Sequence, residues 1–348
     1  MTITTLQRTA AIAAAAGIVL AASACSSGSP TESGAPEDAG TGVLNVGQIS
    51  DSVAFFPLFV AEENGYFEEE GVELGDRPRL GTGARLAAAL TSGSIDIAAG
   101  VTTDAMNLYE SDDRARLTGS LVTEYYVDII VSSDFDGPAA DAPVEERIAA
   151  LQGRNIGITG PGSGTEALVT HLFGTEGLDP STDATLVNLG AEVSAAIGAL
   201  SSGQVDALAF FQPVGQIAEM QGVGEIYISP QRGDVPSMDG QLHGALFSTT
   251  DVLDEKGELV ASFNRAIDSA LAFIADDPEG ASELLASYLG GSDPAVVEAL
   301  SEILPEEMAS STVIEQAGYE TAATFHLDSG LVAEAPAYAD FVWEGAAE

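Results

Sequence analysis

The chain has 348 residues, and its 54 acidic and 11 basic side chains give a formal net charge of −43 at pH 7. A surface this acidic repels nucleic acid and anionic lipid headgroups, which excludes both as expected partners. The apolar fraction of 45% can supply the cores of two domains. We interpret the acidic residues as a solvated coat, typical of proteins that work in high salt, and cation binding is the less favoured alternative.

Residues 1–24 are predicted to be an export signal. Arg8 is their only charged side chain, and the apolar run that follows is about 15 residues long, shorter than the ~20 that span a bilayer. Small residues precede Cys25, the only cysteine of the chain, and this arrangement resembles the bacterial lipobox, although Ala22 replaces the usual Leu. Cys25 is therefore predicted to be lipidated, and ordinary secretion with an incidental cysteine is the alternative.

Residues 25–42 are predicted to be a flexible tether that begins at the lipid anchor. Residues 26–41 contain no large apolar side chain, so burial cannot offset the entropy lost on ordering. We expect the folded body after the tether to lie outside the cell, anchored to the outer face of the membrane.

A repeat dominates the folded body: ALTSGSID at residues 89–96 recurs as ALSSGQVD at residues 199–206. In each copy an alanine-rich helix is expected to end at a glycine, Gly93 or Gly203, that provides a left-handed terminator. A short apolar strand is expected after each copy. The two strands are predicted at residues 95–99 and 205–210.

Strands and helices alternate around both copies, which favours an α/β fold with parallel sheets and helices on both faces. Two copies of one unit predict two similar, doubly wound lobes. Further strands are predicted at residues 44–49 and 155–159, and helices at residues 55–64 and 165–175.

Ligands of open α/β sheets bind beyond the carboxyl ends of the strands, so the turns after strands supply the candidate site. The candidates from these turns are Ser50, Asp51, Thr102, Thr103, Gly162, Ser163, Gly164, Thr165, Phe211 and Gln212. The glycines of the turn at 160–165 let the backbone approach a ligand, and the start of a helix there suits an acidic or carbonyl group. Helix capping alone also explains the hydroxyls of this turn and of Thr102.

Aromatic doublets stand beside these turns at Phe55-Phe56, Tyr125-Tyr126 and Phe210-Phe211. Adjacent residues of a strand face opposite sides, so one ring of a doublet is expected to reach the cleft and to stack on a flat or methyl-rich solute. Burial of both rings in the core is the alternative. His243 is the only histidine expected near the cleft.

No arrangement of residues demands catalysis or a metal. His171, His243 and His326 lack the spacing of metal ligands, and Ser163 lacks the flanking glycines of a nucleophile elbow. We therefore expect no catalytic residue, no metal site and no cofactor.

Several segments resemble the ABC transporter substrate-binding lipoproteins for alkanesulfonates, taurine, nitrate and thiamine precursors. They are FPLFVAEENGYFEEEG at 56–71, GSID at 93–96, LQGRNIGI at 151–158, SGQVDA at 202–207 and the stretch at 263–279. The resemblance implies a periplasmic-binding-protein-like fold of type II with a ligand cleft. Lobe I would comprise residues 43–127 and 246–348 and lobe II residues 128–245, with crossing strands near 126–131 and 244–247.

The same resemblance implies a monomeric receptor that delivers a small solute to a permease and its ATPase. The solute would be sulfonate-like, with its acid group at Gly162, Ser163 and Thr165, or a pyrimidine-like thiamine precursor stacked on aromatic rings. Gln212 departs from the family pattern, in which an acidic residue often precedes the proline. The alternatives are a precursor-synthesising enzyme of the same superfamily and a surface lipoprotein without a transport role.

Overall fold

A computed structural model describes residues 42–330 and 332–348. The predicted signal, Cys25 and nearly all of the predicted tether lie outside the described residues. The strands are β1 (Gly42–Leu44), β2 (Val46–Gln48), β3 (Val72–Leu74), β4 (Ile97–Val101), β5 (Ala115–Val122), β6 (Val127–Ser132), β7 (Asn155–Ile158), β8 (Thr185–Asn188), β9 (Ala207–Phe211), β10 (Gly224–Ile228) and β11 (Gly244–Thr249). The helices are α1 (Phe56–Glu63), α2 (Tyr66–Glu69), α3 (Gly83–Thr91), α4 (Thr102–Ser111), α5 (Val144–Ala150), α6 (Gly164–Thr175), α7 (Pro180–Asp183), α8 (Val193–Ser201), α9 (Val214–Gln221), α10 (Thr250–Asp276), α11 (Pro278–Tyr288), α12 (Pro294–Glu307), α13 (Gln316–Asp328) and α14 (Tyr338–Phe341).

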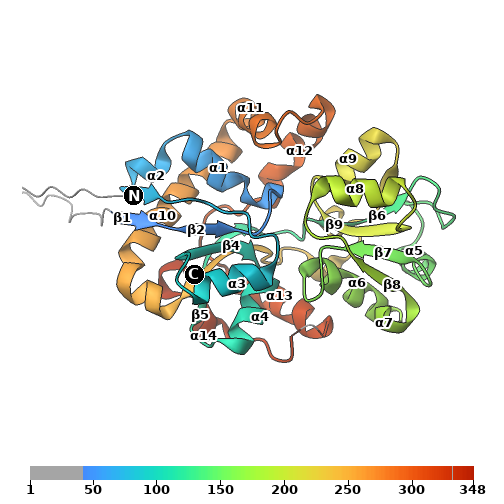
Figure 1. The fold of residues 1–348 in the computed structure, drawn as a ribbon, viewed down its shortest axis with the longest axis horizontal. Helices are drawn as coiled ribbons and strands as arrows, with labels where there is room; N and C mark the ends of the chain where they lie inside the picture. The colour runs from blue at the N-terminus through green and yellow to red at the C-terminus, as the bar shows by residue number, and fades with distance from the viewer. Residues whose placement is uncertain (1–41, 331) are drawn as a thin grey trace, which may run out of the picture. The chain divides into compact units, whose positions relative to one another are not determined.

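The strands form two main sheets, which confirms the α/β class and the two-sheet architecture (Figure 1). The first sheet has the order β2-β4-β11-β5 and the second the order β10-β6-β9-β7-β8. The sheets are mixed rather than parallel, because β11 runs antiparallel to β4 and β5, and β6 runs antiparallel to β9 and β10. Strands β6 and β11 are each the first strand that the chain forms after it changes sheets. Each therefore runs opposite to the strands beside it.

The chain changes sheets twice, once between β5 and β6 and once between β10 and β11. The first crossing therefore lies at residues 123–126, and all but the first residue of the expected crossing strand at 126–131 is already part of β6 in the second sheet. The second lies at residues 229–243, and the expected crossing strand at 244–247 is already part of the first sheet. We call the first sheet with its helices the first lobe and the second sheet with its helices the second lobe.

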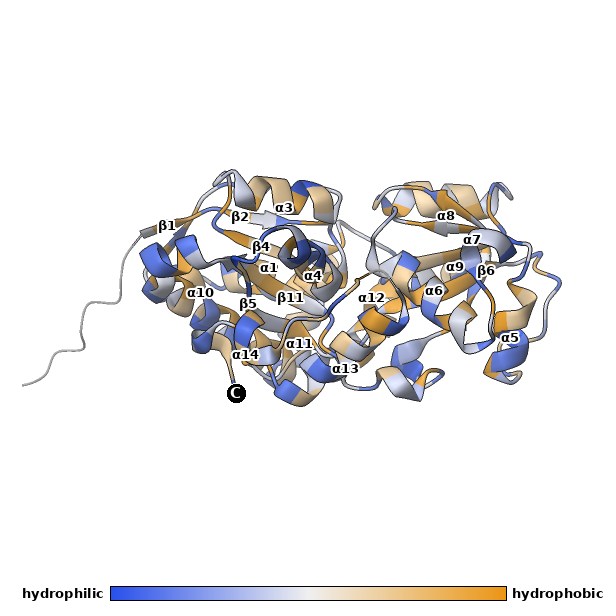
Figure 2. Ribbon diagram, turned by 90° about the horizontal axis from the view of Figure 1, so that it is seen from below, coloured by the Kyte–Doolittle hydropathy of each residue, from blue (hydrophilic) through white to orange (hydrophobic). Residues whose placement is uncertain are grey.

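Helices cover both faces of each sheet. In the first lobe α3 and α4 pack on one face and α10 on the other, while α1 packs on α10. In the second lobe α8 and α9 lie on one face and α5 and α6 on the other (Figure 1). The strands are mostly hydrophobic and the helices carry polar residues on their exposed sides (Figure 2). This pattern gives each sheet an apolar core on both faces, as doubly wound folds require.

The sequence repeat is a structural repeat. Gly93 and Gly203 both have left-handed φ values, +72° and +70°, directly after α3 and α8. The aspartate three residues after each glycine holds a neighbouring strand by a hydrogen bond. Asp96 accepts from the backbone amide of Asn45 at 2.9 Å, and Asp206 accepts from the backbone amide of Asn155 at 2.8 Å. The predicted unit of helix, glycine, aspartate and strand is therefore confirmed in both lobes.

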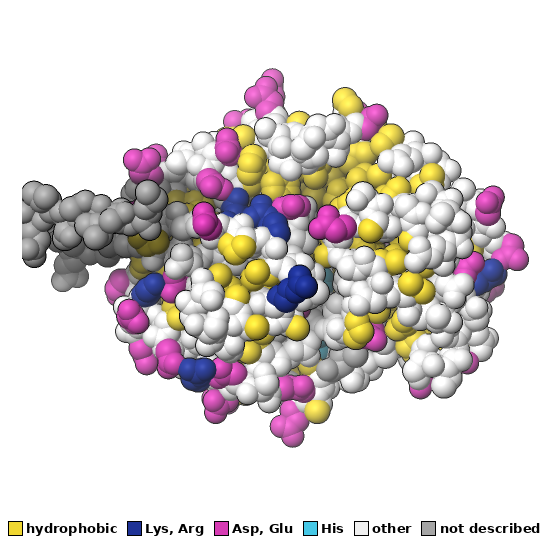
Figure 3. All heavy atoms as spheres, in the orientation of Figure 1, with side chains coloured by type: hydrophobic (Ala, Val, Ile, Leu, Met, Phe, Trp, Pro, Cys, Tyr) yellow, Lys and Arg dark blue, Asp and Glu magenta, His cyan; other side chains and the backbone are white. Residues whose placement is uncertain are grey.

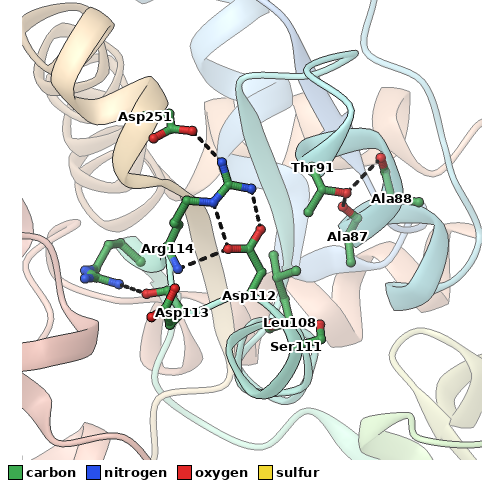
Figure 4. Close-up of polar contacts among 10 residues, drawn as sticks. Ala87, Ala88, Thr91, Leu108, Ser111, Asp112, Asp113, Arg114 and Asp251 are labelled. Atoms are coloured by element: carbon green, nitrogen blue, oxygen red, sulfur yellow. Dashed lines mark hydrogen bonds and ion pairs between the residues drawn. The ribbon is translucent and has the colours of Figure 1, made fainter.

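Ion pairs join distant elements of the first lobe. Lys256, the only lysine of the chain, interrupts the helical geometry of α10 and pairs with Asp96 at 2.7 Å. Arg114, after α4, holds both oxygens of Asp112 and also pairs with Asp251 in the first turn of α10 (Figure 4). None of the described helices combines the length and the apolar composition that crossing a bilayer requires.

Candidate ligand-binding cleft

A cavity of about 520 Å³ lies between the two lobes and is lined by residues from both. Its walls come from the ends of β4, β7 and β9, from the starts of α3 and α6 and from one face of α4. Eight residues predicted as ligand contacts lie in this wall: Ser50, Tyr126, Gly162, Ser163, Gly164, Thr165, Phe211 and His243. Figure 3 shows a hollow on one face of the molecule with histidine atoms at depth.

The glycine turn before α6 forms the wall from the second lobe. Gly162 has a left-handed φ of +75°, and Ser163 is the N-cap of α6, where its hydroxyl accepts the Glu166 amide at 3.3 Å. Thr165 turns inward, and its hydroxyl accepts the Thr159 amide at 3.0 Å. The carboxylate of Glu166 accepts the Gly162 amide at 2.6 Å. Capping and turn closure therefore use much of the hydrogen-bonding capacity of this turn.

Helix α4 forms the facing wall from the first lobe. Asp104, Asn107, Leu108 and Ser111 lie on one face of this helix and line the cavity. The Asn107 side chain donates to the Gly162 carbonyl at 2.9 Å, so it bridges the two lobes at the cavity. Sequence reasoning missed these side chains, although Asp104, Asn107 and Ser111 recur at the spacing of three and four residues that forms a polar stripe on a helix.

The two threonines at the start of α4 are buried and do not line the cavity. Thr102 is not a cap, because α4 begins at this residue and its hydroxyl donates to the Leu242 carbonyl at 2.9 Å. The Thr103 hydroxyl lies 2.6 Å from Nε2 of His326. The side chain that closes this helix start is Asp104, which accepts the Val101 amide at 3.1 Å.

In two of the three aromatic doublets one ring lines the cavity, as expected, although only Phe210-Phe211 lies on a strand and Tyr125-Tyr126 lies in the first crossing. Tyr126 and Phe211 line the cavity, while Tyr125 and Phe210 are buried behind them. The Tyr125 hydroxyl donates to the Gly164 carbonyl, which ties the first crossing to the glycine turn. Phe55 and Phe56 are both buried in the core and neither lines the cavity, because they lie in a short 3-10 helix and at the start of α1 instead of on a strand.

His243 lines the cavity and packs against two tyrosines. Its ring centroid lies 3.9 Å from that of Tyr125 and 4.7 Å from that of Tyr126. Burial and the neighbouring His326 lower the pKa of His243 well below its usual value, so the imidazole is neutral at pH 7.

The other two histidines lie nearer to His243 than expected. His171 and His326 both pack on Phe325, which itself contacts Tyr125. Neither lines the cavity. Over residues 42–330 and 332–348, no three His, Cys, Asp or Glu side chains are grouped as metal ligands.

A second cavity adjoins the first and shares Ser50 and Phe211 with it. Asp51 and Arg79 lie in its wall and pair with each other at 2.5 Å. Gln212 lies in neither cavity: it is fully buried and donates to the Glu307 carboxyl group at 3.0 Å, which joins the second lobe to the end of α12. Glu307 thus brings an acidic group beside the position where the sequence departs from the family pattern.

Comparisons with known proteins agree with this architecture. A curated relative, the putative binding protein YtlA of Bacillus subtilis, is 21% identical over 261 residues, 73% of each chain. The alkanesulfonate-binding protein SsuA of Xanthomonas axonopodis pv. citri, solved with MOPS, superposes with a TM-score of 0.69 at 21% identity, over 89% of this chain and 99% of that one. The nitrate-binding protein NrtA of Synechocystis PCC 6803 has a TM-score of 0.59 at 16% identity, over 74% and 69% of the two chains. These likenesses show a periplasmic-binding-protein fold. The model of the family described as NMT1/THI5 like matches residues 52–281, and the chain belongs to this family.

Proposed function

We propose that this protein is the solute-binding component of an ABC importer. It captures a small organic solute between its lobes and delivers the solute to a membrane permease with its ATPase, and it performs no catalysis. The observation that carries this proposal is the cavity of about 520 Å³, whose wall combines aromatic rings with hydroxyl and amide groups from both lobes. Concave sites with a few convergent polar groups are typical of small-molecule binding.

The position of the cavity suits a receptor that closes around its ligand. The crossings at residues 123–126 and 229–243 connect the lobes, and hinge closure of two lobes around a ligand is a common switching motion. A solute that contacts Asn107 and the glycine turn would add bonds between the lobes. A closed, liganded form is then available for recognition by the permease.

The solute classes follow from the resemblance and from the relatives. A sulfonate-like solute corresponds to the alkanesulfonate-binding protein that superposes on this chain. A pyrimidine-like thiamine precursor corresponds to the family and to the rings of Tyr126 and Phe211. The experiment that follows covers both classes and adds short amides and nitrate.

A thermal-shift screen of sulfonates, pyrimidines, short amides and nitrate tests the receptor function. A ligand at 100 times its dissociation constant adds ~2.7 kcal/mol to the free energy of unfolding, which is a clear rise in melting temperature. Phe211→Ala, which removes a ring from the cavity wall, is expected to abolish the shift. A shift that persists in this variant, or no shift with any class, would contradict solute capture in the cavity.

We also propose that Cys25 carries a lipid anchor and that the protein works outside the cell at the membrane. Cys25→Ala is expected to move the protein from the detergent phase to the aqueous phase in a detergent-phase separation of cells. Solute binding should be unchanged, because the predicted tether separates Cys25 from the folded body. Retention of the variant in the detergent phase would exclude this anchor.

A further inference from the structure

The cavity contains a buried carboxyl group without a basic partner. Asp104 lines the cavity and is 5% exposed, and none of the described cavity-lining residues is Lys or Arg. None of the ion pairs among the described residues includes Asp104. Its hydrogen bond from the Val101 amide uses Oδ2. A buried carboxylate without a counter-charge is unfavourable, so this position gains most from a ligand that supplies positive charge.

Two glycines make room for this carboxyl group. A Cβ atom at Gly83 would lie 1.9 Å from Asp104 Oδ1, and one at Gly100 would lie 3.0 Å from Asp104 Oδ2. Gly83 is the first residue of α3 and itself lines the cavity. Any larger residue at position 83 would displace the carboxyl group, so the backbone of the first lobe is shaped around Asp104.

On the facing wall a carboxylate already occupies one of the donors that an anion would use. The Gly162 amide, in the glycine turn, donates to the Glu166 carboxylate. An anionic ligand at this turn would therefore meet a carboxylate within one helical turn. His243 contributes no positive charge, since burial and His326 lower its pKa well below the usual value.

The adjoining cavity supplies no unpaired positive charge that would attract an anion. Arg79 lines that cavity, but its guanidinium is paired with Asp51 at 2.5 Å. In the first cavity the rings of Tyr126 and Phe211 complete the wall. Aromatic faces attract cations, and this attraction strengthens when the cation is desolvated.

We infer that the solute carries a cationic nitrogen group, such as an amidine, a guanidine or an amine, and that Asp104 binds this group. The inference rests on the proposed function of the cavity as the solute site. It narrows the solute from the two classes above to a nitrogen-rich one, for which a protonated aminopyrimidine qualifies and a simple sulfonate does not. The long-range field of a chain with a net charge of −43 also favours the approach of cations.

Three probes that share one benzene ring test the inference: benzamidine as the cation, benzamide as the neutral analogue and benzenesulfonate as the anion. We expect benzamidine to raise the melting temperature of the wild-type protein most and benzenesulfonate to have no effect. Asp104→Asn retains the shape and an acceptor for the Val101 amide, so the variant should fold. Its affinity for benzamidine, measured by calorimetry, should fall ten-fold or more, because the charge that binds the amidinium is gone.

The control is Asp113→Asn, which removes one negative charge from an exposed residue just beyond α4 and outside both cavities. It should bind benzamidine as the wild-type protein does. Equal affinity of Asp104→Asn and wild type for benzamidine, no binding of benzamidine, or stronger binding of benzenesulfonate would overturn the inference. Binding of benzenesulfonate that is lost in Phe211→Ala would overturn it and leave the receptor function intact, whereas failure of the full screen above would overturn both.

Discussion

Asp104 couples its ionisation to folding as well as to the cavity. Burial raises the pKa of this carboxyl group to about 7, while an aspartate of the unfolded chain ionises near its ordinary pKa of about 4. At a pH between these two pKa values, the Asp104 carboxyl group is protonated in the folded state and ionised in the unfolded state. Asp104 therefore lowers the free energy of unfolding as the pH rises from about 4 to 7.

The variant Asp104→Asn isolates this effect from the other buried groups. Asp128 and Glu307 also have pKa values raised to about 7 by burial, and burial lowers the pKa of His326 to about 4, so the wild-type profile is a sum of opposing slopes. The difference in the free energy of unfolding between variant and wild type should rise between about pH 4 and 7, by on the order of 4 kcal/mol at most, and then level. Urea unfolding without ligand at several pH values measures it. A difference that does not change with pH would show that Asp104 is not buried as an uncompensated acid.

The repeated unit is the element that organises both lobes, and its two aspartates differ in their partners. Asp96 accepts the backbone and side-chain amides of Asn45 and also pairs with Lys256, whereas the Asp206 carboxyl group has only the bond from the Asn155 backbone amide. Hydrogen bonds to charged groups contribute about 1.5–3 kcal/mol. The first lobe therefore depends more on its aspartate.

We expect Asp96→Asn to lower the free energy of unfolding by about 2 kcal/mol and Asp206→Asn by about 1 kcal/mol. The first variant leaves Lys256 without its carboxylate, and the second removes only a charge from a bond that asparagine can retain. Chemical denaturation of the two variants side by side provides the comparison. If Asp206→Asn lowered the free energy of unfolding more than Asp96→Asn does, the aspartate of the second lobe would contribute more to stability than that of the first.

Local patterns predicted the elements better than they predicted the site. The terminators Gly93 and Gly203 and the glycine turn before α6 follow from glycine geometry, so the sequence indicated them directly. Thr102 and Thr103 looked like cavity hydroxyls, but their partners Leu242 and His326 lie 140 and 223 residues away. Such contacts carry no local signal. Asp104 was overlooked for a different reason: it has a local signal in its helical spacing with Asn107 and Ser111, but an acid among 54 acids is informative only when its burial is known.

At the scale of the whole molecule, charge is the dominant feature. Acidic side chains are scattered over the face shown in Figure 3 and basic ones are few, in keeping with the net charge of −43. Self-repulsion of this kind opposes the compact state.

Salt should therefore stabilise the folded protein. Screening shortens the Debye length from ~10 Å at 0.1 M to ~3 Å at 1 M, so the melting temperature should rise over this range of sodium chloride. A parallel series in sucrose at matched osmolality separates screening from the general effect of an excluded solute. A melting temperature that stays level or falls in sodium chloride would contradict the interpretation of the acidic residues as a salt-adapted coat.

Hydrogen–deuterium exchange with and without the most stabilising solute tests the capture of a solute between the two lobes most directly. The solute should slow exchange in α4 of the first lobe and in the turn at residues 159–165 of the second, since both line the same cavity. Phe211→Ala, at the same solute concentration, should lose the protection of both segments together. Protection confined to one lobe, or located away from these segments, would contradict the capture of the solute between the two lobes.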